Sequence, residues 1–460
     1  MTHYDAIVIG SGQGGTPLSK KLAQQGLKTA LIEKRFIGGT CINDGCTPTK
    51  TMVASARTAH TARNSKALGV HTGEVTVDLP AIVQRKNEIV NMFRDGSEKG
   101  LEKTDGLELI MGEAVFTGPK QLIVSLNKGG TLELSADKVF INTGTTAQIP
   151  PINGLDDIRF VTNTTILQLT QIPEHLLVLG GGYIGLEFGQ MFSRFGSKVT
   201  IVETSDHLLP HEDRDIADCI CGILMDEGIT VNTDSSADNF KMEGKNIKAT
   251  LIVKGQQQQI TCSHVLVAAG RVPQTARLQL QKTGVDTNEK GFINVNNKLE
   301  TSAEGIYAFG DVKDGPAFTH IAYNDHLIIY KNLFEHASLI IEGRPVPYCM
   351  FTDPQLGRIG LSEDEAIKKG FNIKTAVLSM DKVARAIETG ETRGIMKAVV
   401  NADDNQILGA AIIGEEGGET MTVLQVAMMG KLPYTDIKEA IFAHPLYAES
   451  LNNLFMAINK

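Results

Sequence analysis

The order of apolar runs and polar stretches along the chain repeats one pattern twice. An apolar run from Tyr4 to Ile9 has the character of a strand, and it is followed by glycines, a helical segment and a second strand that ends at Glu33. The apolar run from Leu176 to Leu179 begins the same succession, whose second strand ends at Glu203. Strands that alternate with helices indicate parallel sheets covered by helices. The pattern therefore predicts an α/β protein with two such units.

In both units the first strand leads into glycines with the spacing G-x-G-x-x-G. In such a motif the first glycine permits a sharp turn, the second lets the backbone approach a pyrophosphate, and the third lets helix and strand pack closely. Glu33 and Glu203 each lie eighteen residues after the last glycine, where a carboxylate accepts hydrogen bonds from a ribose. We therefore predict two dinucleotide-binding units. The glycines are Gly10, Gly12 and Gly15 in the first unit, and Gly180, Gly182 and Gly185 in the second.

Three more apolar runs end in glycine. Those from Val139 to Gly144 and from Val265 to Gly270 have a proline shortly after, which is typical of an exit from a nucleotide-binding domain. The third, from Ile306 to Asp311, places an acid at a strand end, where a doubly wound sheet binds its ligand. The alternative for Asp311 is a turn-capping residue.

Beyond about residue 346 the glycine motifs cease. Strands are expected over 373–378, 396–400 and 407–413, together with helices near 419–430 and 449–458. This mixture predicts a separate α+β domain.

The length of the chain indicates how many domains it has, and its net charge helps to exclude classes of ligand. A chain of 460 residues suggests about three domains. The net charge of -9 and the lack of a basic block argue against nucleic-acid binding. The N-terminal apolar run is too short for a signal peptide, and no stretch reaches the roughly 18 apolar residues that span a bilayer. We therefore expect a cytoplasmic protein that binds neither nucleic acid nor membrane.

Two of the six cysteines, Cys41 and Cys46, flank the tetrapeptide Ile-Asn-Asp-Gly. In a reducing cytosol a close pair is usually catalytic or metal-binding, but a metal needs about four ligands and no further Cys or His lies nearby. Pro48 indicates a helix N-terminus, which stabilises a thiolate. These residues favour a reactive thiol pair over two inert thiols. Cys219 and Cys221, two residues apart in an expected helix, do not face each other and are expected to serve packing.

At the segment GGTCINDGCTPTK, residues 38–50, the chain resembles the class I pyridine nucleotide-disulfide oxidoreductases, the group that contains glutathione reductase, lipoamide dehydrogenase and mercuric reductase. The resemblance runs essentially end to end. It implies two Rossmann-like domains, for FAD and NAD, plus a C-terminal α+β dimerisation domain. The implied division is an FAD-binding domain over 1–148, an NAD(P)H-binding domain over 149–271, a return segment of the FAD domain over 272–345, and a dimerisation domain over 346–460.

The resemblance also implies roles for side chains. Electrons would pass from the nicotinamide through the flavin to Cys46, the thiol nearer the ring, and Cys41 would attack the substrate through a mixed disulfide. Lys50 and Glu187 resemble an ion pair beside the flavin, the alternative being two ordinary surface charges. Tyr183 resembles the side chain that covers the nicotinamide pocket.

The segment from Phe442 to Glu449 resembles the acid-base motif of the same family. A thiol leaving group needs a proton near neutral pH, and His444 oriented by Glu449 would supply it. The alternative is a structural histidine. In the family this histidine reaches the cysteines of the other subunit, which implies a homodimer with composite active sites.

The motifs and the resemblance together predict a set of cofactor-binding residues, and they predict no metal site. The set consists of Gly10, Gly12, Gly15, Glu33, Gly39, Thr40, Lys50, Thr143, Gly144, Gly180, Gly182, Tyr183, Gly185, Glu203, Gly270, Gly310 and Asp311.

The choice of nicotinamide nucleotide depends on Glu203. A carboxylate repels a 2′-phosphate, and residues 204–210 contain no arginine, so NADH is expected rather than NADPH.

The choice of electron acceptor rests on conflicting features. Residues 383–386 and 392–394, together with Lys397, resemble the mercuric reductase branch. Residues 454–460 have no cysteine pair, however, no metal-binding domain precedes Met1, and the mercuric pattern has tyrosine at the position of His444. A small-molecule disulfide or another oxidised acceptor is therefore ranked first. Dihydrolipoamide dehydrogenase and mercuric ion reductase are the alternatives, and glutathione reductase fits less well. A flavin-bound redox sensor is the non-enzymatic alternative, but it would have no need of His444.

Overall fold

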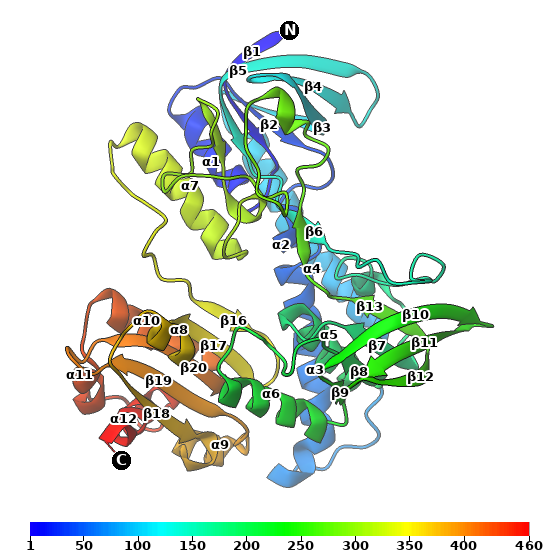
Figure 1. The fold of residues 1–460 in the computed structure, drawn as a ribbon, viewed down its shortest axis with the longest axis vertical. Helices are drawn as coiled ribbons and strands as arrows, with labels where there is room; N and C mark the ends of the chain where they lie inside the picture. The colour runs from blue at the N-terminus through cyan, green and yellow to red at the C-terminus, as the bar shows by residue number, and fades with distance from the viewer. Residues whose placement is uncertain (460) are drawn as a thin grey trace. The chain divides into compact units, whose positions relative to one another are not determined.

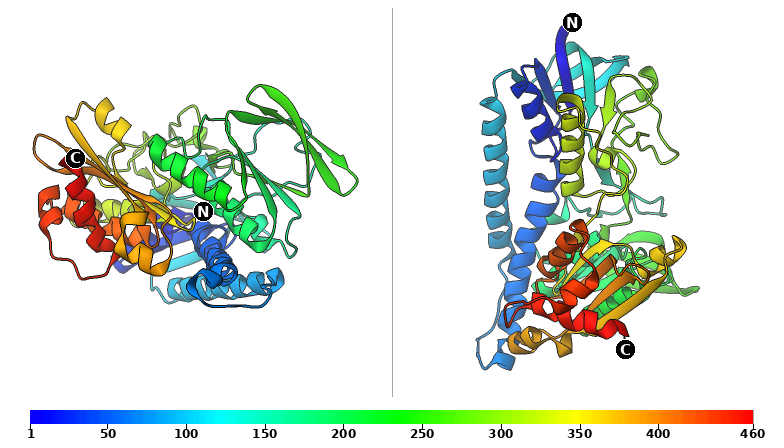
Figure 2. Two further views of the ribbon diagram at one scale, coloured as in Figure 1. Left: turned by 90° about the horizontal axis from the view of Figure 1, so that it is seen from below. Right: turned by 90° about the vertical axis from the view of Figure 1, so that its left-hand side faces the viewer.

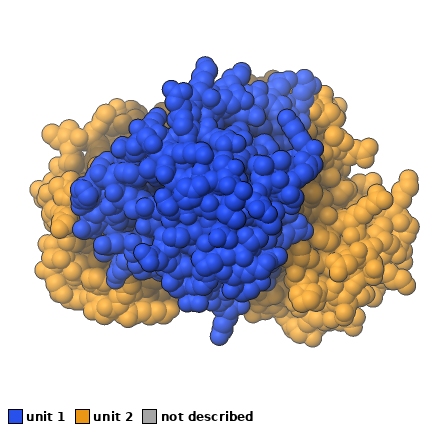
Figure 3. Space-filling view, turned by 90° about the horizontal axis from the view of Figure 1, so that it is seen from above, with its two compact units in different colours: residues 1–51, 84–148, 270–344 blue, residues 52–83, 149–269, 345–460 orange. Residues whose placement is uncertain are grey.

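The computed structural model describes residues 1–459, which form two compact units (Figure 3). Unit 1 consists of residues 1–51, 84–148 and 270–344, and unit 2 of residues 52–83, 149–269 and 345–460. The last residue, Lys460, lies outside the described residues. The finer division into four domain segments stays a prediction.

Unit 1 is built on a six-stranded sheet (Figure 1). Its centre is parallel, because β1 pairs with both β2 and β5, whereas β4 runs antiparallel to β3 and β5. A two-stranded antiparallel ribbon, β6 with β14, follows the end of the sheet. The strands are β1 (Thr2–Ile9), β2 (Thr29–Glu33), β3 (Leu107–Gly118), β4 (Gln121–Leu126), β5 (Thr131–Ile141), β6 (Thr145–Ala147), β14 (Arg271–Pro273) and β15 (Ile306–Ala308).

The central strands of unit 1 are buried on both faces, which explains their nearly continuous apolar sequence. Successive side chains of β1 point to opposite faces: Ala6 and Val8 pack in a core with α1 (Gly15–Gln24) and α7 (Thr319–Phe334), while Ile7 belongs to the core on the other face. The strand expected at residues 4–9 therefore lies at the centre of this sheet.

The first part of unit 2 is a four-stranded parallel sheet. Alternation along β7 again separates two cores: Leu176 and Val178 face the helices, whereas Leu177 and Leu179 face a three-stranded antiparallel sheet. The parallel strands are β13 (His264–Val267), β7 (His175–Leu179), β8 (Lys198–Val202) and β9 (Thr230–Asn232). The helices are α5 (Tyr183–Phe195) and α6 (Arg214–Asp226), and the antiparallel strands are β10 (Ser235–Glu243), β11 (Asn246–Val253) and β12 (Gln256–Cys262).

The C-terminal part of unit 2 is a five-stranded antiparallel sheet, and α10, α11 and α12 gather on one of its faces (Figure 2). The strands are β16 (Tyr348–Met350), β17 (Gln355–Gly360), β20 (Ile407–Gly414), β19 (Ile395–Asn401) and β18 (Ile373–Ser379). The helices are α8 (Glu363–Lys368), α9 (Ala384–Thr389), α10 (Gly417–Met429), α11 (Tyr434–Glu439) and α12 (Ser450–Met456). The expected fold class, two α/β sheets plus an α+β part, is confirmed.

The remaining helices are α2 (Gly39–Asn43), α3 (Cys46–Asn64) and α4 (Leu79–Glu102). None of the helices within residues 1–459 has the length and apolar character to cross a membrane.

His326 of α7 provides a test of the core of unit 1. Its side chain is fully buried, and burial lowers its pKa to about 4. Because the unfolded chain binds this proton near pH 6.5, the stabilisation is present above that pH and is lost as the pH falls toward 4. The expected slope is at most about 1.4 kcal/mol per pH unit. Urea unfolding between pH 7 and 4 should show this slope flattened in His326→Leu but kept in the exposed control His71→Gln. Equal slopes in wild type and His326→Leu would contradict the assignment.

Candidate active site

The two predicted redox cysteines lie together in unit 1. Cys41 is in α2 and Cys46 is the first residue of α3, so both are held by helices that the intervening Asp44 and Gly45 separate. The side chains of the two cysteines are hydrogen-bonded to each other. The Cys46 sulfur also lies 3.3 Å from the hydroxyl oxygen of Thr319, the first residue of α7.

This environment raises the pKa of Cys41. The hydrogen bond to Cys46 and burial raise the pKa of Cys41 above its ordinary value, while Thr319 and Lys50 act in the opposite direction. The reduced pair therefore keeps a proton on Cys41 at neutral pH. For Cys41 to act as a nucleophile, a base must remove that proton.

The first glycine motif is fastened to the strand end beside it. One carboxylate oxygen of Glu33 accepts hydrogen bonds from the backbone N–H and the hydroxyl of Ser11, at 3.0 and 2.8 Å. Asn142 ties the loop from the other side, because its side chain accepts from the Gly15 N–H at 3.0 Å and donates to the Phe309 carbonyl at 2.8 Å. Gly10 has φ of +103° and a Cβ there would lie 2.3 Å from the Asn142 carbonyl oxygen, so only glycine fits.

The other predicted residues of this set surround the same loop. Gly39 lies so close to Gly12 that an added Cβ would be 2.6 Å from its Cα, which brings the start of α2 against the glycine motif. The Thr143 hydroxyl is buried without a hydrogen-bond partner, and burial raises the pKa of Asp311. A bound FAD would supply partners for these polar groups. The residues of unit 1 therefore fit this cofactor.

The second glycine motif, in unit 2, repeats the first. A carboxylate oxygen of Glu203 accepts from the Gly181 N–H at 2.6 Å, and the other oxygen accepts from the Ser205 N–H at 2.8 Å. Burial alone would raise the pKa of Glu203, but these backbone hydrogen bonds outweigh it and lower the pKa, so the carboxylate is ionised at neutral pH. No atom lies within 4 Å of a Cβ built on Gly182, so the space beside this residue is open to a ligand.

Tyr183 begins α5 beside this motif. Its hydroxyl donates to a carboxylate oxygen of Glu212 at 3.1 Å, and the Tyr348 hydroxyl donates to the same oxygen. The guanidinium of Arg358 lies 3.3 Å from the other carboxylate oxygen. Glu212 and Tyr348 were not predicted from the sequence, since they come from a loop and from a strand far along the chain.

Glu187 is buried in α5, and one of its carboxylate oxygens accepts the Phe351 N–H at 2.7 Å. It is therefore not an ordinary surface charge. Lys50 lies in unit 1, where it lowers the pKa of Cys41, and its pairing with Glu187 stays a prediction.

The predicted acid-base residues are paired in unit 2. The Nδ1 atom of His444 lies 2.9 Å from a carboxylate oxygen of Glu449. The His444 side chain is 67% exposed and that of Glu449 is 33% exposed, so the ring is oriented by a carboxylate while it stays accessible.

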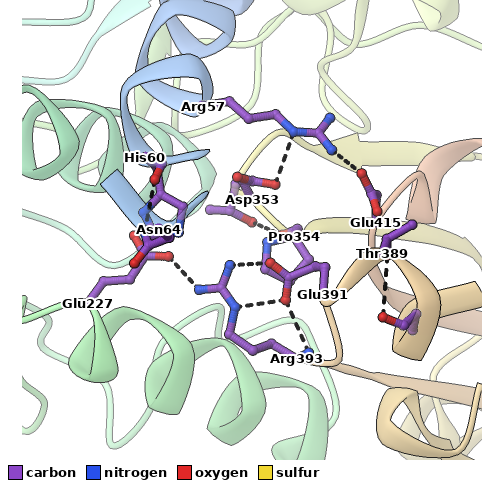
Figure 4. Close-up of polar contacts among 12 residues, drawn as sticks. Arg57, His60, Asn64, Glu227, Asp353, Pro354, Thr389, Glu391, Arg393 and Glu415 are labelled. Carbon is purple, nitrogen blue, oxygen red and sulfur yellow. Dashed lines mark hydrogen bonds and ion pairs between the residues drawn. The ribbon is translucent and has the colours of Figure 1, made fainter. Parts of the chain in front are cut away.

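Residues that suggested the mercuric branch have partners inside unit 2. The Arg393 guanidinium donates hydrogen bonds to a carboxylate oxygen of Glu227 at 2.6 Å and to one of Glu391 at 2.8 Å (Figure 4). Lys397 lies 2.7 Å from a carboxylate oxygen of Glu363. Both side chains therefore form ion pairs within unit 2.

Two nucleotide-binding sheets and a close thiol pair define a class of flavin- and nicotinamide-dependent dithiol enzymes. The chain belongs to the pyridine nucleotide-disulphide oxidoreductase family, which it matches over residues 4–325, with the dimerisation domain of that family over residues 346–455. It is an enzyme that depends on FAD and NAD(P)H, and the interpretation as a non-enzymatic sensor is set aside.

Several proteins are similar over nearly the whole chain. The probable pyridine nucleotide-disulfide oxidoreductase RclA of Escherichia coli K12 is 37% identical over 100% of both chains. A solved structure of the Cu(II) complex of HOCl-induced flavoprotein disulfide reductase RclA from Escherichia coli is 36% identical and covers 99% of each chain with a TM-score of 0.91. A mercuric reductase of Staphylococcus aureus is 34% identical over 99% of this chain and 83% of its own length. A dihydrolipoyl dehydrogenase of Thermus scotoductus is 34% identical over 100% of this chain and 98% of its own.

The open position at Gly182 gives a sharp test of the nicotinamide site. Gly182→Ala is expected to raise the KM for NADH by about tenfold or more, because the added methyl group stands where a pyrophosphate approaches. FAD content and the thermal unfolding midpoint should stay unchanged. Gly222→Ala in α6, where a Cβ also meets no atom, is the matched control and should keep the wild-type KM. An unchanged KM in Gly182→Ala would place the nucleotide elsewhere.

Proposed function

We propose that this enzyme is a homodimer that uses NADH to reduce a small-molecule disulfide through Cys41 and Cys46. The observation that carries the proposal is the hydrogen-bonded thiol pair at the start of α3, in the unit that also contains the first glycine motif. The four-segment division into FAD, NAD(P)H, FAD-return and dimerisation domains is part of the proposal. The proposed compartment is the cytoplasm, where a close cysteine pair is usually catalytic or metal-binding.

The chemistry follows from the protonation of the thiols. His444 of the partner subunit removes the proton from Cys41, whose sulfur then attacks one sulfur of the substrate disulfide. The substrate S–S bond breaks, and the leaving thiolate takes the proton from His444. The Cys46 thiol next gives up its proton and attacks the Cys41 sulfur of the mixed disulfide. The bond between Cys41 and the substrate sulfur breaks, the second substrate thiolate takes up that proton, and the Cys41–Cys46 disulfide forms. FAD, when bound, supplies the passage of two electrons from the nicotinamide to this disulfide. Lys50 and Glu187 would flank the ring as an ion pair.

The preference for NADH is proposed from the charge of Glu203. The ionised carboxylate accepts hydrogen bonds from ribose hydroxyls and repels a 2′-phosphate. Tyr183 would cover the nicotinamide pocket.

The ratio of kcat/KM for NADH to that for NADPH is expected to be about ten or more, because only the 2′-hydroxyl form avoids repulsion at Glu203. Glu203→Gln should lower this ratio by removing the charge while leaving an acceptor oxygen. A tenfold preference for NADPH in the wild type would contradict the assignment.

Loss of the attacking thiol separates disulfide chemistry from flavin chemistry. Cys41→Ser is expected to reduce disulfide turnover by about a thousandfold, while NADH-dependent reduction of ferricyanide, which needs no thiol, continues. Cys221→Ser in α6 is the control and should turn over normally. Retained disulfide turnover in Cys41→Ser would show that the thiol roles are wrong.

The acceptor itself is open to a direct screen. A second candidate class is a thiophilic metal ion, favoured by the Cu(II) complex that the similar RclA forms and by the similarity to a mercuric reductase. Steady-state rates with NADH and lipoamide, glutathione disulfide, other small disulfides, Hg(II) or Cu(II) would rank the acceptors. A disulfide is expected to give the highest kcat/KM.

A further inference from the structure

The proposed acid-base group has little structure of its own to hold it. His444 is exposed and its ring is oriented by Glu449, five residues later in the same loop. A catalytic side chain must be held within about 0.5 Å of its productive position. The precision of this pair therefore depends on what fixes the loop.

Tyr447 is the anchor of this loop. It lies in the single 3-10 turn that ends at Glu449, and its ring packs against the core of the C-terminal sheet. Its hydroxyl donates to a carboxylate oxygen of Glu415 at 2.6 Å and lies 2.9 Å from the hydroxyl of Thr389. Burial and the bond to Glu415 raise the pKa of Tyr447 to about 12, so the hydroxyl stays a donor at neutral pH.

Glu415 is held in turn by α3. Its other carboxylate oxygen accepts from the Arg57 guanidinium at 2.5 Å, and Arg57 also lies 3.7 Å from Asp353 (Figure 4). The Glu415 side chain is 22% exposed and that of Arg57 is 38% exposed, so the pair lies at the edge of the solvent and contributes through its geometry. Arg57 lies about three turns along the helix that begins at Cys46.

We propose that Tyr447 is a positioning residue for the acid-base pair, acting through Glu415 and Arg57. The inference rests on the proposed role of His444. Tyr447 itself touches neither substrate nor cofactor: it fixes the turn that carries Glu449, and Glu449 orients the His444 ring. The contacts of Tyr447 with Glu415 and of Glu415 with Arg57 thereby fasten the acid-base loop to the part of α3 that belongs to unit 2.

The first test removes one hydroxyl. Tyr447→Phe is expected to lower kcat for disulfide reduction by about tenfold, with the KM for NADH and the rate of ferricyanide reduction unchanged, because only proton transfer to the thiols is affected. Tyr434→Phe removes a hydroxyl from the same core, where its ring lies 5.7 Å from the Phe455 ring, and should keep the wild-type kcat. A wild-type kcat in Tyr447→Phe would overturn the inference.

The second test is a double-mutant cycle with Glu415→Gln. If the two residues act as one chain, the double variant loses no more activity than Tyr447→Phe alone. Additive losses in kcat would mean that Tyr447 serves packing only and would overturn the proposal. Should Tyr447→Phe lose its FAD or its fold, Glu415→Gln alone decides, with the same expected drop in kcat and unchanged ferricyanide rate.

A parallel variant separates this inference from the proposed function. His444→Gln is expected to lower disulfide turnover by about a hundredfold or more and to abolish one limb of its pH profile. That same limb should be displaced in Tyr447→Phe. If His444→Gln is fully active, the proposed function fails. If His444→Gln is inactive while Tyr447→Phe keeps the wild-type rate and pH profile, only the positioning inference fails.

Discussion

The proposed chemistry depends first on the hydrogen bond between the side chains of Cys41 and Cys46. This contact and burial raise the pKa of Cys41, so the reduced pair holds a proton that a base has to remove before the sulfur can attack a substrate. His444, proposed as that base, lies 2.9 Å from a carboxylate oxygen of Glu449, and its ring is accessible. Without a base, the thiol pair would attack a disulfide substrate only slowly. A base on a loop that is not held in place would rarely lie where it can remove the proton. The proton held by Cys41 thus explains the proposed need for residues 444–449, which lie far from the two cysteines in the sequence.

A second constraint, binding two dinucleotides, is met in the same way in both units. Glu33 and Glu203 each accept a backbone N–H from the residue that follows the first glycine of the motif, and each accepts a second N–H from two residues further along its own loop. The carboxylate therefore shapes the glycine loop, in addition to the ribose contact proposed for it. Removing either charge would loosen the loop in addition to changing specificity, which is why Gln is a better probe than Ala at these positions.

Local sequence was enough to predict the strands, the glycine motifs and the thiol pair, because each is encoded within a short segment. Hydrogen-bond partners that are far apart in the sequence could not be predicted. Asn142 fastens Gly15 across 127 residues, and Tyr348 joins Glu212 across 136. The sequence shows that these residues are polar but not what they contact. Arg393 and Lys397 illustrate the converse: their pattern suggested a substrate branch, yet both form ion pairs within unit 2. Tyr447 lies inside the motif that the sequence indicated, but the positioning role proposed for it rests on its contact with Glu415, which the sequence does not show.

The central claim is that electrons from NADH reach Cys41 and Cys46, and counting thiols tests it most directly. The oxidised holoenzyme is mixed anaerobically with one equivalent of NADH, alkylated and digested, and the cysteine peptides are quantified by mass spectrometry before and after reduction. The account predicts that Cys41 and Cys46 change together from unreactive to alkylated, while the other four cysteines keep their initial labelling. Oxidation of NADH with no change in the labelling of Cys41 and Cys46 would contradict it.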